Sequence, residues 1–385
     1  MGVHVGTKGQ HVNHVKSALL HVLAFMKKNV VLCVAFLLAL LTSFIVPPDK
    51  EYLGYFDFKT LTCLFCVLAV VCALKNVRFF YALAQKIVSM FKTARLCVLA
   101  LVYVTFIGSM LIANDMALLT FLPLGYFVLS STGKTKYMAV TFILQNISAN
   151  LGGMLTPFGN PQNLYLYTKF GIPTSEFMAI MLPHFLVSVL LITACCFLFV
   201  KNEPLVLEGE KIVLPVKRTV FYLGLFLLSI VIVFRWIPYQ IGLVVIVVSL
   251  LIADRNALKK VDYPLLFTFV FFFIFAGNTS RIGVIRSLLS GLLEKDTLLV
   301  STLSCQLISN VPTAILLSQF TGNYAELLVG VNIGGVGTLI SSLASLITFR
   351  EYVNRNPKKT GYYVALFSAF NFAFLFLLTG FAVLV

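Results

Sequence analysis

The stretch GGMLTPFGNPQN, residues 152–163, decides how this chain folds. Its two prolines and three glycines interrupt an apolar run that extends from Tyr137 to about Thr168. Each proline removes a backbone donor and disrupts the preceding helical turn, and glycine permits tight turns. Inside a membrane, the unpaired backbone groups of such a break persist only where protein or a wet cavity satisfies them. The stretch therefore predicts an interrupted helix beside a polar site.

The composition of the whole chain is that of a membrane protein. Of the 385 residues, 59% are hydrophobic and 11% are charged, whereas a soluble globular chain carries about 25% charged residues. Solidly apolar runs of roughly 17–25 residues recur, which is the length of a membrane-spanning helix. These features exclude a soluble enzyme, a secreted disulfide scaffold and a disordered tail, and they disfavour a β-barrel. We predict an all-α polytopic membrane protein.

The net charge of +15 lies between the apolar runs, so we interpret it as cytoplasmic loop charge and expect no nucleic-acid partner. A basic N-terminal arm over residues 1–28 carries four lysines and no acid, which predicts a cytoplasmic N-terminus. The acidic connection 48–57 is expected to be external, and the basic stretch 75–95 cytoplasmic. The lipid bilayer of the cell membrane, inner or plasma, is the expected location of this multi-pass chain.

The order of the apolar runs predicts two halves. A polar linker at 201–218, expected to be cytoplasmic, separates a first transmembrane repeat at 29–200 from a second at 219–385. Each half contains an apolar run with a polar centre, at 97–131 and at 297–320, and the first of these is too long for one span and barely long enough for two. We expect each of these runs to be a re-entrant helical hairpin. The prediction is about nine spans plus two hairpins and interrupted helices.

Matching motifs in the two halves support a repeat. Leu111–Asn114 (LIAN) echoes Leu307–Asn310 (LISN), and Asn150–Thr156 (NLGGMLT) echoes Asn332–Thr338 (NIGGVGT), in the same order. Because the charge pattern gives the halves opposite orientations, these matches predict two inverted repeats. Interrupted segments at corresponding positions of two halves are the best sequence pointer to the binding site of a transporter.

Polar residues at the breaks are the candidate substrate contacts. A helix start offers free amides to an anion, and a helix end offers free carbonyls to a cation. No Arg or Lys is expected inside the site, so anion binding would rest on amides, hydroxyls and a bound cation. The candidate substrate-binding residues are Asn114, Thr156, Asn160, Asn163, Asn310, Thr313, Thr338, Ser341 and Ser342.

Asp115 is the sharpest single candidate. An acidic side chain near the middle of a membrane costs roughly 2.5–3.5 kcal/mol and is functional by default. Asp115 would hold Na⁺ with neighbouring carbonyls or carry a proton; the alternative is an acid at a hairpin mouth that reaches cytoplasmic water. The eight cysteines form no zinc pattern. We expect no metal beyond Na⁺, no cofactor beyond the coupling ion, and no enzyme, because no nucleophile–base set is present.

The motifs resemble those of a known superfamily. Gly159–Asn163 (GNPQN), preceded by Gly152 and Gly153, resembles the G-[TN]-P-[PQ]-N segment of the ion transporter superfamily. That group contains divalent anion/sodium symporters, citrate transporters and arsenite permeases. Ala113–Asp115 resembles the hairpin tip of arsenite-permease relatives, and Ser309–Val311 resembles the Ser-Asn-Thr tip of the sodium/dicarboxylate branch, although neither tip is a full Ser-Asn-Thr.

The resemblance implies a homodimer built on a scaffold domain, elevator-like movement of the hairpin domain, and substrate between the hairpin tips. It also implies cation sites that would involve Asn114, Asp115, Gly159, Ser309, Asn310 and Gly337. We therefore predict a secondary active transporter of a small anion, a carboxylate or an inorganic oxyanion, coupled to Na⁺ or H⁺. The alternatives are a cation/proton antiporter that exchanges ions at Asp115 and an arsenite efflux permease.

Overall fold

The structure, a computed structural model, describes residue 26 and the ranges 29–205 and 213–385. Most of these residues are helical, and the two short extended pieces form an isolated bridge between Thr93 and Pro204. Within the described ranges, seven helical stretches are long and apolar enough to cross a membrane. The prediction of an all-α polytopic membrane protein is confirmed. The predicted basic arm and the centre of the predicted linker lie outside the described residues.

The helices of the first half begin at residues suited to start them. Asp57 accepts a hydrogen bond from the Thr60 amide at the start of α3, and Thr93 accepts one from the Leu96 amide at the start of α5. The elements are α2 (Val30–Ile45), η1 (Lys50–Tyr55), α3 (Phe58–Asn76), α4 (Phe79–Val88), α5 (Ala94–Ile112), α6 (Asn114–Ser131), η2 (Thr135–Tyr137), α7 (Met138–Gly152), η3 (Gly153–Leu155), α8 (Pro161–Lys169) and α9 (Thr174–Phe199).

The second half follows the same order of elements. Asp262 and Asp296 cap the starts of α13 and α15 by accepting backbone amides. The elements are α10 (Val216–Val233), α11 (Tyr239–Ala253), α12 (Arg255–Lys259), α13 (Tyr263–Arg281), α14 (Gly283–Lys295), α15 (Thr297–Ile308), α16 (Asn310–Leu317), α17 (Tyr324–Ile333), α18 (Leu343–Arg355), η4 (Pro357–Lys359) and α19 (Thr360–Leu384).

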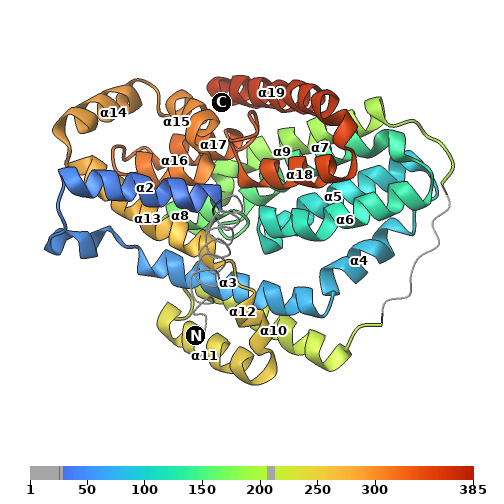
Figure 1. The fold of residues 1–385 in the computed structure, drawn as a ribbon, viewed down its shortest axis with the longest axis horizontal. Helices are drawn as coiled ribbons and strands as arrows, with labels where there is room; N and C mark the ends of the chain where they lie inside the picture. The colour runs from blue at the N-terminus through green and yellow to red at the C-terminus, as the bar shows by residue number, and fades with distance from the viewer. Residues whose placement is uncertain (1–25, 27–28, 206–212) are drawn as a thin grey trace, which may run out of the picture.

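The two halves interlock in matching pairs of helices. In Figure 1, α2 lies along α13. The helix of the second half that corresponds to α2 is α11, and it packs against α3, which corresponds to α13. In the same way α6 packs against α18, and α16 packs against α8. Helix α10 has no counterpart among the described helices of the first half. Each half therefore completes the packing of the other.

An ion-pair cluster around Glu203 fastens three segments that are distant in the sequence. Lys134 and Lys136, between α6 and α7, reach the Glu203 carboxylate at 2.8 and 2.5 Å, and the Tyr137 hydroxyl donates to it at 3.0 Å. The Glu203 carbonyl also accepts the Ala94 amide at the start of α5. The two lysines lower the pKa of Glu203 to about 2. The end of α9 is thereby tied to the hairpin of α5 and α6.

Glu203→Gln is expected to lower the unfolding temperature at pH 7 but to have little effect near pH 2. Because the folded pKa of about 2 lies below the ordinary 4.5, ionised Glu203 stabilises the fold fully above pH 4.5. That contribution is lost as the pH falls through the folded pKa. Thermal unfolding of both proteins across this range measures it, with Glu294→Gln, on exposed α14, as control. A pH-independent difference would contradict the assignment.

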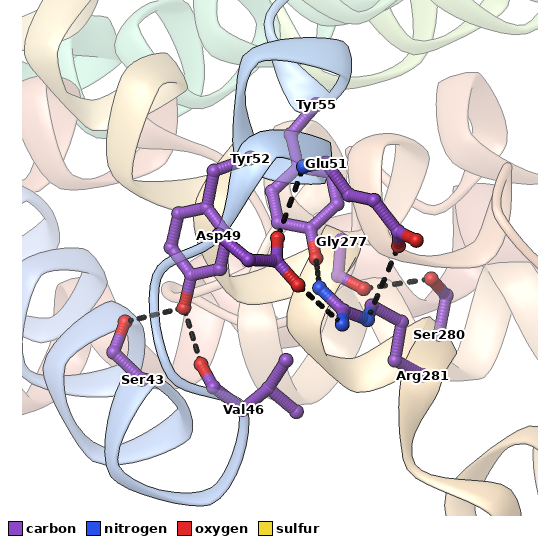
Figure 2. A network of polar contacts seen from close by, with 9 residues as sticks. All are labelled: Ser43, Val46, Asp49, Glu51, Tyr52, Tyr55, Gly277, Ser280 and Arg281. Atoms are coloured by element: carbon purple, nitrogen blue, oxygen red, sulfur yellow. Dashed lines mark hydrogen bonds and ion pairs between the residues drawn. The ribbon is translucent and has the colours of Figure 1, made fainter.

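A second polar network joins the acidic connection after α2 to the end of α13 (Figure 2). Arg281 donates to Asp49 at 2.6 Å and to the Tyr55 hydroxyl at 3.0 Å, and it lies 3.4 Å from Glu51. The Arg281 guanidinium lowers the pKa of Asp49. Gly277 makes room for the Tyr55 ring, because a Cβ there would lie 2.4 Å from it. The connection is therefore held firmly against α13.

Cysteines placed at Leu53 and at Lys358 are expected to label from opposite sides of the membrane. Leu53 is 72% exposed in the acidic connection, which the charge pattern places outside, and Lys358 is exposed in the basic η4, which it places inside. Labelling intact cells with a membrane-impermeant maleimide should modify the Leu53→Cys variant only. The unaltered chain is the control, because its eight native cysteines are buried or half-buried. Equal labelling of both variants would invalidate the predicted threading.

Candidate functional site

The two predicted hairpin tips have the same backbone geometry. Ala113, between α5 and α6, has φ 65° and ψ 150°, and Ser309, between α15 and α16, has φ 73° and ψ 157°. Non-glycine residues rarely adopt this region, and doing so costs about 1–3 kcal/mol. In each tip the next residue is an asparagine, Asn114 or Asn310, whose Oδ1 accepts the following amide at 2.9 Å. We refer to Ala113–Asp115 and Ser309–Val311 as the first and second tips.

The two interrupted helices also match. The α-helix ends at Gly152, is followed by the single 3-10 turn η3, and α-helical geometry resumes in α8 after Asn160. In the second half the α-helix ends at Ile333 and resumes in α18 after Ser342. Within each break, a threonine hydroxyl donates a hydrogen bond to a backbone carbonyl in the helix before the tip, and in both halves the acceptor is the residue four positions before the tip asparagine. These bonds are Thr156 to Met110 at 2.8 Å and Thr338 to Gln306 at 3.0 Å. Each break is thus fastened to the helix that leads into its own tip.

Buried amides connect the two breaks across the halves. Asn160 Nδ2 donates to Asn332 Oδ1 at 3.3 Å, and Ser342 Oγ donates to Asn150 Oδ1 at 2.8 Å. These two bonds are equivalent. Asn160 precedes α8 and binds the first residue of the second-half motif, and Ser342 precedes α18 and binds the first residue of the first-half motif. Asn332 Nδ2 also donates to Asn163 Oδ1 at 2.6 Å. All five residues are nearly inaccessible to solvent. We call this group the amide network.

Close helix packing explains the first glycine of the repeated pair, Gly152 in one half and Gly334 in the other. A Cβ on Gly152 would lie 2.2 Å from the Phe106 carbonyl oxygen in α5, and a Cβ on Gly334 would lie 2.8 Å from Cys305 in α15. Both clashes are with the helix that carries a tip. Glycine at these positions therefore lets α7 and α17 approach the hairpins closely enough for the tips to reach the amide network. Asn114 completes this contact by donating to Asn150 Oδ1 at 3.2 Å.

Both tips line one cavity of about 1030 Å³. Asn114 and Asn310 contribute to its wall, as do Gln162 at the start of α8 and Ser342 before α18. The two tip asparagines therefore line the same cavity. The first residues of four helices, α6, α8, α16 and α18, meet here. Helix starts carry a partial positive charge, so this convergence creates a favourable environment for an anion.

Basic side chains line the same cavity, contrary to the expectation that no Arg or Lys belongs to the site. Lys75 comes from the last turn of α3, Lys259 and Lys260 from the end of α12, and Arg350 from α18. The expectation is wrong for the cavity as a whole. These residues stand beside apolar runs in the sequence and were interpreted as loop charge. In three dimensions the ends of α3 and α12 and the middle of α18 converge on the cavity.

The cavity also contains acids. Asp115 lies in the first turn of α6, and its Oδ1 is buried without a hydrogen-bond partner within the described part of the chain. The same holds for Gln162 Oε1 in the first turn of α8. Both residues line the cavity, together with Asp262 and Glu351. A buried oxygen without a hydrogen-bond partner is costly. A cation would satisfy both oxygens, whereas a proton would be taken up by the Asp115 carboxylate alone.

The predicted site residues divide into two groups. Asn114, Asp115, Ser309, Asn310 and Ser342 line the cavity. The others do not line it and have protein partners or backbone roles: Thr156, Gly159, Asn160, Asn163, Thr313, Gly337, Thr338 and Ser341.

Sequence reasoning left several cavity and network residues out of the site. Gln162 was the easiest to find, since it stands inside the GNPQN motif. Asn150 and Asn332 begin the two matching motifs, so the repeat itself was the signal for them. Lys260 and Arg350 carried no local signal.

Comparisons with known proteins agree with this architecture. The family model for the citrate transporter matches residues 20–329. An uncharacterized transporter of Methanocaldococcus jannaschii is 33% identical over 318 residues, which cover 82% of this chain and 86% of the relative. The inner membrane protein YbiR of Escherichia coli is 28% identical over 317 residues, covering 80% and 84%. The match extends over most of the chain and includes both tips, and it confirms the resemblance to the ion transporter superfamily. This chain is therefore a transporter that belongs to the citrate transporter family.

Proposed function

We propose that the protein is a secondary active transporter that couples the movement of a small anion, a carboxylate or an inorganic oxyanion, to Na⁺ or H⁺. The observation that carries this proposal is the single cavity lined by both tips and by the starts of four helices. An anion held there would receive backbone amides and helix-start charge, and Lys260 and Arg350 would attract it to the opening. The binding of substrate between the tips follows from this arrangement.

The coupling ion would bind at the first tip. The unpartnered Asp115 carboxylate oxygen and the Gln162 side-chain oxygen line the same cavity as the anion would. A cation or proton at Asp115 removes the repulsion between that carboxylate and an arriving anion. Loading of the two ligands is then mutually favourable, which is what a symporter requires. We propose no cofactor beyond this ion.

Movement of the hairpins would provide alternating access. Lys75, Lys260 and Arg350 line the cavity, and the charge pattern predicts that they lie on the cytoplasmic side, which supports our proposal that the described conformation is inward-facing. At the predicted external side, Arg235 stacks on the Tyr167 ring at the end of α8, 4.2 Å from its centroid. We propose an elevator-type transition in a homodimer in the cell membrane, with release of this contact as one step.

Transport into proteoliposomes tests the proposal. Purified protein would be offered labelled succinate, citrate, sulfate and arsenite, with Na⁺ and pH gradients imposed separately. Uptake of one anion class that depends on one of the gradients supports anion symport. Absence of uptake for all four, under either gradient and in both orientations, would contradict it.

A second candidate function is a cation/proton antiporter. Asp115 favours it, because a buried carboxylate can exchange ions without an organic substrate. In that case an imposed Na⁺ gradient would move protons in the absence of any added anion, which a pH-sensitive dye inside the vesicles detects. The arsenite-efflux alternative predicts that arsenite is the single transported species of the four. The same vesicles therefore separate all three functions.

A further inference from the structure

A second concave region of about 480 Å³ lies at one end of the molecule, where α3, α11 and α12 end and α10 begins. Three of its lining residues are basic, namely Arg218 in the first turn of α10, Arg255 at the start of α12, and Lys260. We call this region the basic groove. It lies on the side that the charge pattern assigns to the cytoplasm.

The single acid of the basic groove is engaged by the protein. Asp254 accepts a hydrogen bond from Asn76 Nδ2 at 2.9 Å and another from the Ala257 amide at 3.2 Å. Lys260 Nζ donates to Asn76 Oδ1 at 2.7 Å, and Arg255 uses its Nε on the Leu251 carbonyl. The remaining guanidinium nitrogens of Arg255 and the whole of Arg218 carry an excess of positive charge into the groove. The chemistry is that of an anion site.

The helices α10 and α11, which flank the basic groove, carry exposed apolar side chains. On α10, Val216 and Val220 are 70% and 62% exposed, and on α11 Ile252 is 82% exposed. A ligand with a charged head and hydrocarbon tails would satisfy both the groove and these flanks, whereas a small soluble anion would use the groove alone. Basic pockets between helices on the cytoplasmic side are known to hold anionic lipid headgroups.

We propose that the basic groove binds the phosphate of an anionic lipid headgroup, with the acyl chains lying along α10 and α11. Asn76 and Lys260 line both this groove and the cavity of the candidate site. A headgroup that pairs with Lys260 therefore also changes the charge at the edge of that cavity. The binding itself does not depend on which substrate is transported.

Lipid titration of the full-length protein in detergent tests this proposal. Phosphatidylglycerol, phosphatidylcholine and inorganic phosphate would each be added, with bound lipid counted by native mass spectrometry and thermal unfolding as a second readout. Phosphatidylglycerol is expected to bind in preference to the other two. Arg218→Gln and Arg255→Gln should each weaken its binding about fivefold, since one basic residue near a membrane surface contributes about that factor.

Lys217→Gln is the matched control, because Lys217 is the exposed neighbour of Arg218 on α10 and does not line the groove. Arg218→Lys, which keeps the charge, should retain most of the binding. The unfolding temperature without lipid verifies that each variant is folded. Equal binding of phosphatidylglycerol and phosphatidylcholine, or equal effects of Lys217→Gln and Arg218→Gln, would overturn the proposal. Variant-sensitive binding of inorganic phosphate without lipid binding would assign the groove to a soluble anion and overturn the lipid assignment.

Discussion

Asp115→Asn is expected to reduce coupled transport roughly tenfold or more while leaving the protein folded. Asparagine has nearly the shape of aspartate, so the first tip should keep its geometry, including the bond from the residue 115 amide to Asn114 Oδ1. It can neither take up a proton nor offer a full negative charge to a cation. The loss should therefore fall on coupling rather than on stability.

The way in which transport by the Asp115→Asn variant depends on pH and on Na⁺ identifies the coupling ion. If Asp115 carries a proton, uptake by the variant should no longer respond to an imposed pH gradient. If it binds Na⁺, the variant should need much more Na⁺ for the same uptake, because a charge-bearing ligand has been replaced by a neutral one. Initial rates in proteoliposomes, measured against pH and against Na⁺ concentration, separate these outcomes.

Asp262→Asn is the matched control for this experiment. Asp262 lines the same cavity, but its carboxylate already caps α13 by accepting the Leu265 amide at 3.0 Å, and asparagine caps equally well. This variant should retain coupling. Near-normal transport and ion dependence in Asp115→Asn would mean that Asp115 is a wet acid at the hairpin mouth. The coupling role would then pass to the second tip, around Asn310.

Asn332→Ala is expected to abolish transport and to lower the free energy of unfolding by about 2–4 kcal/mol, because buried groups lose their partners. Asn332 is 1% exposed; it donates to Asn163 Oδ1 and to the Leu328 carbonyl and accepts from Asn160. Alanine removes all three bonds from the amide network. The starts of α8 and α18, which depend on that network for their placement, would then shift at the cavity.

Thermal and chemical unfolding in detergent measure the stability loss, and uptake measured below the unfolding temperature measures the functional one. Asn356→Ala is the matched control, since Asn356 lies outside the cavity and its side chain makes only long contacts, at 3.4 Å and 3.5 Å. That variant should unfold close to the parent temperature. A similar temperature for Asn332→Ala, with full uptake, would show that the amide network does not position the site.

Local chemistry explains why the breaks and tips were predictable from the sequence. Pro157 lies within the first break and Pro161 begins α8, positions where the missing amide donor of proline costs little, and the repeated LIAN/LISN motifs mark two tips whether or not the fold is known. The same reasoning did not reveal which polar side chains face the cavity. Thr156 and Thr338 point back to backbone carbonyls, and that direction depends on dihedral angles within the break.

The basic lining of the cavity could not be predicted because its members are far apart in the chain. Lys75, Lys260 and Arg350 come from three different helices, α3, the end of α12, and the middle of α18, which meet only when the two halves interlock. The bond between Asn160 and Asn332 joins residues 172 positions apart, and no local pattern encodes such a pairing. The positions of charged side chains around the cavity and the contacts between the two halves depend on how the helices pack, so they are difficult to predict from a single sequence.

The amide network also has a consequence for biosynthesis. Asn150 and Asn160 enter the membrane with the first half of the chain, but the groups that pair with them, Ser342 and Asn332, are made later. At roughly 5–20 residues per second, the 172 positions between Asn160 and Asn332 take about 10–35 s to synthesise. During that interval Asn150 and Asn160 keep their hydrogen bonds within the first half, with Asn114 and with the Asn150 carbonyl, but lack their partners from the second half. Assembly of the complete amide network must therefore wait until translation has nearly ended.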